Sequence, residues 1–178
     1  MLKNIVSKEG PIGRDSMPVF KNWSKKQTLI ERVAKTTSDI FGPAGDHLGV
    51  RDKWEAHCSR NGTRSFIGNY KDNRFNALFQ TSAEILFHRK DFIKVINHVS
   101  NKNLKIKAVL ADLQSDCVQQ MLKALCLIYV TITGPYWWLI TSGTVPCLEL
   151  APVIKQLESF LQTCTTQPEL LVRQEINW

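Results

Sequence analysis

Apolar residues recur at three- and four-residue steps along much of the chain, the spacing that places side chains on one face of a helix. The clearest case begins at Asp72, a suitable helix N-cap. Asp91 then starts a further helical turn. The pattern therefore predicts consecutive helical segments in the middle of the chain, whose inward positions are Phe75, Leu78, Phe79, Ser82, Ile85 and Leu86, followed by Phe92, Val95, Ile96 and Val99.

The same spacing predicts helices on both sides of this centre. Ser24 and Gln27 match a capping box for a helix that ends near Phe41, before Gly42 and Pro43. Further helices are predicted over residues 47–58, 104–113, from 116 onward, and over 148–161. We expect an all-α or nearly all-α fold, an irregular multi-helix bundle, over residues 23–165. Residues 1–22 are predicted to be a flexible leader, and residues 166–178 a C-terminal tail or short helix.

A long uncharged segment separates Lys123 from Glu149. A membrane-spanning helix needs about 20 mainly apolar residues, so a single span over residues 124–148 is an alternative. However, Gly134-Pro135 falls near its middle, and such a pair ordinarily ends a helix. We therefore favour two buried elements that meet at a turn, and a membrane location is disfavoured. Residues 128–133 are rich in β-branched side chains, so a strand there remains an alternative.

The formal net charge of +7 is unevenly distributed. Residues 1–107 contain 20 Lys and Arg against 10 Asp and Glu, whereas residues 108–178 contain 3 against 6. This asymmetry predicts that residues 108–161 form a water-excluded helical interior behind a basic surface that suits a polyanion. Alternatively, the basic side chains are dispersed over solvated helix faces. The candidate phosphate contacts are Lys25, Lys26, Arg74, Arg89 and Lys90.

No motif for catalysis or metal binding stands out. The four His and five Cys show neither the Cys-x-x-Cys nor the His-x-x-x-His spacing of zinc sites. Cys58 beside His57 is the one candidate nucleophile, but sequence neighbours on a helix do not face each other. We therefore expect no catalytic residue, no metal ligand and no cofactor, and a protein that is not an enzyme. The odd number of Cys favours a reducing compartment.

Several stretches between Gln27 and Leu161 resemble animal proteins derived from transposable elements. They cover residues 45–54, 70–79, 108–113 and 133–137. Arg74-Phe75-Asn76 is similar to the Arg-Trp-Asn signature of hAT-type transposases, whose catalytic domain is an RNase H-like fold interrupted by a helical insertion. The residues that carry the resemblance are Asn73, Arg74, Phe75, Asn76, Gly134, Pro135 and Trp137.

The resemblance implies cut-and-paste DNA transposition, in which carboxylates hold Mg²⁺ ions, and an intracellular, nuclear location. No Asp or Glu matches the catalytic triad of that family. We therefore interpret the chain as the region around and within the helical insertion. It is predicted to be a non-catalytic helical domain that contacts DNA backbone without sequence specificity, or a protein partner or second copy. The alternatives are a fragment of a metal-dependent transposase or nuclease, and a single-span membrane protein.

Overall fold

The computed structural model describes residues 10–20, 26–45, 49–71, 74, 76–143, 146 and 149–172. Every regular element in these ranges is helical, which confirms the predicted all-α class. The elements are η1 (Gly13–Ser16), η2 (Pro18–Phe20), α2 (Leu29–Phe41), α3 (Val50–Asn61), α4 (Ala77–Asn97), α5 (Leu104–Gln114), α6 (Asp116–Ile128), the π-helical η3 (Tyr129–Thr133), α7 (Gly134–Thr141), α8 (Leu150–Thr166) and η5 (Pro168–Leu171).

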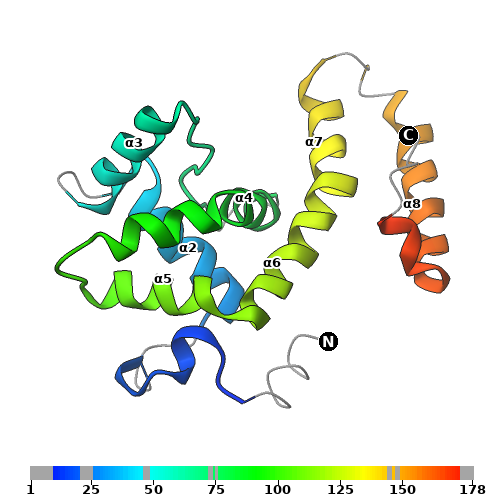
Figure 1. Cartoon of the computed structure of the whole chain (residues 1–178). Coiled ribbons are helices and arrows are strands. Elements are labelled where there is room, and N and C mark those ends of the chain that lie inside the picture. The colour runs from blue at the N-terminus through cyan, green and yellow to red at the C-terminus, as the bar shows by residue number, and fades with distance from the viewer. Residues whose placement is uncertain are drawn as a thin grey trace.

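Helix α4 lies at the centre of the packed part of the molecule (Figure 1) and contacts α2, α3, α5 and α6. Its inward face follows the predicted three- and four-residue steps, and Ile85, Phe92 and Ile96 have no exposed surface. The helix continues without a break through Asp91 to Asn97, so the further turn predicted at Asp91 is simply part of α4. The predicted N-cap Asp72 lies outside the described residues.

The first long helix begins later than predicted. The Thr28 side chain accepts a hydrogen bond from the Glu31 N–H, and Glu31 accepts one from the Thr28 N–H, so the capping box is Thr28 with Glu31. Ser24 lies outside the described residues, and Gln27 precedes the helix. The predicted end at Phe41 is confirmed. The next helix, predicted over 47–58, covers Val50–Asn61. Gly62, at φ 61°, ends it as a left-handed C-cap, and residues 47 and 48 lie outside the described residues.

Residues 12–20 belong to the packed domain and are not a flexible leader. Ile12 and Phe20 are buried, and Arg14 is 2% exposed. The Arg14 guanidinium lies 2.6 Å from the fully buried carboxylate of Asp112 on α5, and the Arg14 backbone N–H donates to the same carboxylate at 2.7 Å. Gly13 permits this approach, because its φ is 57° and a Cβ there would lie 2.7 Å from Asp112 Oδ1.

The Arg14–Asp112 pair is part of a larger polar network. Arg14 also donates to Thr36 Oγ1 and to the Arg32 carbonyl, and Arg32 forms a two-pronged ion pair with Asp15 at 2.7 and 2.8 Å. Burial raises the pKa of the Asp112 carboxyl, while the neighbouring Arg14 opposes that shift. The network therefore joins η1, α2 and α5 through hydrogen bonds that leave the buried charges compensated.

An aromatic cluster fills the space between α2, α3 and α4. The Trp54 ring, 1% exposed, makes edge contacts with Phe41, Phe92 and His88 at centroid distances of 5.9, 4.6 and 4.9 Å. Its indole N–H donates to Ser65 Oγ at 2.9 Å. Trp54 therefore faces inward and anchors α3 to α2 and α4.

The cluster includes a buried histidine that must be neutral. The Phe66 N–H donates to His88 Nε2 at 3.1 Å, so Nε2 carries no proton. Burial lowers the pKa of His88 below its usual value of 6.5. The unfolded chain therefore takes up a proton at a higher pH than the folded chain, and stability falls as the pH drops through the unfolded-state pKa.

We expect the free energy of unfolding to decrease between pH 7 and pH 5, by up to about 1.4 kcal/mol per pH unit for this proton. His88→Gln removes the titration but keeps an oxygen that can accept the Phe66 N–H. Urea unfolding at several pH values should show a flatter dependence for this variant than for the wild type. His98→Gln, an exposed control, should keep the wild-type slope. If the free energy of unfolding depended equally on pH in all three proteins, His88 would not be the group that causes the dependence.

The long uncharged segment does not contain the predicted turn or strand. Residues 116–141 form one continuous helix of 26 residues, built from α6, η3 and α7. Gly134 and Pro135 lie inside it, because the π-helical hydrogen bond from the Gly134 N–H to the Tyr129 carbonyl changes the local register. Pro135 then occupies the first turn of α7, where a missing N–H costs little.

Candidate functional site

Among the described residues, more than half of the exposed large apolar side chains lie on η3, α7 and α8, which we call the apolar arm (the described residues between 129 and 166). Figure 1 shows α6 and α7 leaving the packed domain as one long helix, with α8 returning antiparallel beside α7. No residue of α7 is buried, and only Leu150 and Cys164 are buried on α8. Six large apolar side chains of the arm are at least 37% exposed: Val130, Trp137, Trp138, Ile140, Ile154 and Leu161.

This exposure corrects the prediction of a water-excluded interior over residues 108–161. Only 6% of the most apolar 18-residue window of the 116–141 helix is buried. The buried core instead runs from Ile12 to Leu122. Sequence periodicity identified the apolar faces of these helices but could not tell whether another part of the chain covers them. By length and composition alone the helix could also cross a membrane.

A groove of about 290 Å³ runs between the two helices of the apolar arm. Its walls are almost entirely apolar, and it lies on the side of α7 that faces α8. Because the two helices alone do not close the groove, apolar surface remains in contact with solvent. The lining residues are Ile132, Pro135, Tyr136, Trp138, Leu139, Val153 and Leu157.

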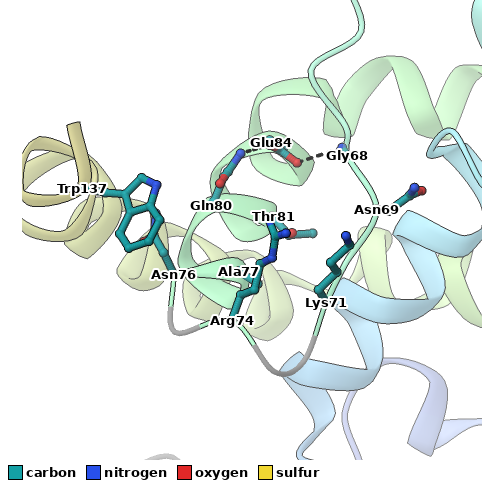
Figure 2. A pocket seen from close by; sticks show the side chains of 10 residues that line it. All are labelled: Gly68, Asn69, Lys71, Arg74, Asn76, Ala77, Gln80, Thr81, Glu84 and Trp137. Carbon is teal, nitrogen blue, oxygen red and sulfur yellow. Dashed lines mark hydrogen bonds between the residues drawn. The ribbon is translucent and has the colours of Figure 1, made fainter. Parts of the chain in front are cut away.

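A second cavity, of about 570 Å³, lies at the start of α4 (Figure 2). It brings together three of the residues that carry the family resemblance, Arg74, Asn76 and Trp137, although Trp137 is far from the other two in sequence. Gly134 and Pro135 do not line it but shape the helix that carries Trp137. Asn73 and Phe75 lie outside the described residues. The other lining residues are Gly68, Asn69, Lys71, Ala77, Gln80, Thr81 and Glu84.

Sequence reasoning missed the role of Glu84 in this cavity. Its two carboxylate oxygens accept hydrogen bonds from the Gly68 N–H at 3.1 Å and the Gln80 side chain at 2.9 Å. Burial raises the pKa of Glu84. In the sequence, Glu84 is marked only by its place on the same helical face as Gln80 and Thr81. That place does not show that the loop before α4 and helix α7 close a cavity around Glu84.

The candidate phosphate contacts do not form one site. Arg74 is exposed at the second cavity, and Lys26 and Lys90 are exposed elsewhere. Arg89 is half-buried, and its Nε donates to the Leu113 carbonyl at 2.7 Å, so it fixes the end of α5. Lys25 lies outside the described residues. The structure therefore separates Arg74 from the other candidates and places Lys71 beside it instead.

His57 and Cys58, the one candidate catalytic pair, occupy structural positions. In the described part of the chain, no group of three His, Cys, Asp or Glu side chains is placed to hold a metal ion. His57 lies 3.5 Å from Asp91, and its ring stacks on Trp54. Cys58 is buried, and burial raises the pKa of its thiol, which disfavours the nucleophilic thiolate.

Comparison of the chain with protein-family models, with curated proteins and with solved structures finds no match. The resemblance to transposon-derived proteins therefore stays a prediction.

Proposed function

We propose that this protein is a non-catalytic helical domain that self-associates through its apolar arm. The observation that supports this proposal most strongly is the exposure of large apolar side chains along α7 and α8. Contiguous exposed apolar surface in a folded protein is typical of an interface with another macromolecule. On α7, Trp137 lines the cavity at the start of α4, and Trp138, at 62% exposed, and Ile140, at 39%, are the other large apolar side chains that would gain from burial.

The apolar arm is the part of the surface where a second copy of the chain meets the least electrostatic repulsion. The chain carries a net charge of +7, so two copies repel each other over most of their surface. No charged residue lies between Lys123 and Glu149, so this repulsion is weakest at α7. Two antiparallel hairpins of the α7–α8 kind can pair into a four-helix bundle, which buries the apolar stripes that one hairpin leaves exposed.

Self-association predicts a mass that depends on concentration. By light scattering, we expect the full chain to be dimeric at tens of micromolar in buffer without detergent. Trp138→Glu combined with Ile140→Glu places two charges in the interface and should yield a monomer. Phe87→Glu, which changes an aromatic residue of the packed domain that is 71% exposed, should remain a dimer.

Two outcomes would contradict self-association. One is a wild-type protein that is monomeric at 100 μM or above. The other is equal dimerisation of the wild type and the doubly charged variant. If the wild type is monomeric and also floats with phospholipid vesicles, whereas the charged variant does not, the apolar arm serves as a membrane element instead.

Contact with DNA backbone is a second candidate function, favoured by a basic seam between α3 and α4. Lys53, His57 and Arg60 follow one another at helical spacing on α3. His57 contacts Asp91 on α4, next to the exposed Lys90 and Lys94. Basic side chains that follow one another along two packed helices can contact several phosphates of one duplex.

The binding of duplex DNA to this seam should depend steeply on salt. Each phosphate contact contributes a slope of about −0.9 to the logarithm of affinity against the logarithm of salt concentration. Fluorescence anisotropy should therefore give a slope steeper than about −2 for the wild type. Lys53→Glu with Arg60→Glu should make it shallower. A salt-independent affinity, or no binding at low salt, would contradict this candidate.

A further inference from the structure

The cavity at the start of α4 presents two cations that no described carboxylate neutralises. Lys71 and Arg74 both line it, both are exposed, and the ion pairs of the described residues include neither. Helix α4 has 21 residues, no acidic residue in its first turn, and an N-cap, Asn76, whose side chain makes no capping bond. Because a helix N-terminus carries partial positive charge, this side of the cavity suits an anion.

Two hydrogen-bond acceptors in the same cavity require that a ligand also carries hydrogen-bond donors. Asn76 is 8% exposed, and none of the described residues donates a hydrogen bond to its Oδ1. Its side chain leaves the start of α4 in the direction of Trp137 (Figure 2). A buried acceptor without a partner costs free energy, which a ligand donor would recover.

Glu84 is the second acceptor that needs a donor from the ligand. Among the described residues, Gly68 and Gln80 each donate one hydrogen bond to its carboxylate, one to each oxygen, and the oxygens keep lone pairs for further donors. A simple anion would leave Asn76 unpaired and would be repelled by Glu84. An anion that also carries hydroxyl groups satisfies both the cations and the acceptors.

We propose that this cavity binds a small phosphorylated sugar, either free or as part of a nucleotide. Its phosphate is held by Lys71, Arg74 and the first turn of α4, and its hydroxyl groups donate to Asn76 and Glu84. Trp137, 50% exposed, supplies an aromatic wall for the ring of the ligand. The cavity volume of about 570 Å³ is within the range of small-molecule sites.

The test is a titration of the ¹⁵N-labelled full chain followed by NMR, with ribose 5-phosphate, adenosine 5′-monophosphate, inorganic phosphate and ribose as probes. We expect shifts at residues 68–71 and 76–84 and at the Trp137 indole. Ribose 5-phosphate should bind at least about tenfold more tightly than either inorganic phosphate or ribose. Tighter binding of the nucleotide identifies a nucleotide site, and equal binding identifies a site for the free sugar phosphate; both support the proposal.

Variants separate the two halves of the site. Lys71→Ala with Arg74→Ala should lower the affinity for every phosphate-containing probe at least about tenfold. Asn76→Leu should weaken the binding of ribose 5-phosphate but not that of inorganic phosphate. The variant should keep its fold because no described residue donates a hydrogen bond to Asn76 Oδ1. Lys90→Ala with Lys94→Ala, near the other end of α4, is the matched control and should leave all affinities unchanged.

Three results would overturn the proposal. Ribose 5-phosphate and inorganic phosphate could bind equally, which would remove the role of the acceptors. The shifts could spread over all lysine-rich segments instead of the cavity. The control variant at Lys90 and Lys94 could lose as much affinity as the cavity variant at Lys71 and Arg74. The loss would then follow from the lower net charge and not from the cavity.

Discussion

Replacing Asp112 by alanine is expected to lower the free energy of unfolding by about 3–5 kcal/mol. The carboxylate is fully buried, and it accepts hydrogen bonds from both the backbone and the guanidinium of Arg14. Its removal leaves the 2% exposed Arg14 without a counter-charge in the interior. Chemical denaturation followed by far-ultraviolet circular dichroism measures the loss directly.

Two further variants isolate the cause. Arg14→Met with Asp112→Leu removes both charges at similar volume, so it should be markedly more stable than Asp112→Ala. Arg51→Ala breaks the exposed pair with Glu55 and should cost no more than about 0.5 kcal/mol. An Asp112→Ala protein as stable as the wild type would show that η1 does not contribute to the folded domain.

Replacing Trp54 by alanine is expected to cost about 3–5 kcal/mol. The ring is 1% exposed and contacts three rings of α2 and α4 as well as the His57 ring of its own helix, so its loss leaves a cavity at the junction of three helices. The Ser65 hydroxyl also loses the indole N–H that donates to it. Thermal and denaturant unfolding of the variant should both report the effect.

Trp138→Ala provides the matched control for the aromatic cluster. This residue is 62% exposed on the apolar arm, so its truncation should change the stability of the monomer by less than about 1 kcal/mol. Equal losses at Trp54 and Trp138 would contradict the division of the chain into a packed domain and an exposed arm.

The fold class and the inward face of α4 could be predicted because they follow from helical periodicity. Phe92, Val95 and Ile96 repeat at the expected steps and are buried. The start of α2 was misplaced, since Ser24-Gln27 and Thr28-Glu31 both fit a capping box, and only the register of the packed helix selects the second. Gly134-Pro135 was misread as a turn because the π-helical bond that accommodates the proline has no sequence signature of its own.

Long-range partners were beyond the reach of the sequence. Arg14 sits between glycine and proline residues that are typical of a loose segment, and nothing local shows that it meets Asp112 across 98 positions. The cavity at the start of α4 was not predicted, although three of its lining residues, Arg74, Asn76 and Trp137, were singled out by the family resemblance. Lys71 and Glu84 were not, since their placement depends on how the loop at 68–71 packs against α4.

In the proposed dimer, the apolar arm of each copy is covered by the other copy. Hydrogen–deuterium exchange at increasing protein concentration tests it most directly, because it reports each helix separately. We predict that amides of α7 and α8 exchange more slowly as the concentration rises from about 1 to about 100 μM, while amides of α2–α5 are unchanged. Exchange in α7 and α8 that is fast and independent of concentration would contradict the claim.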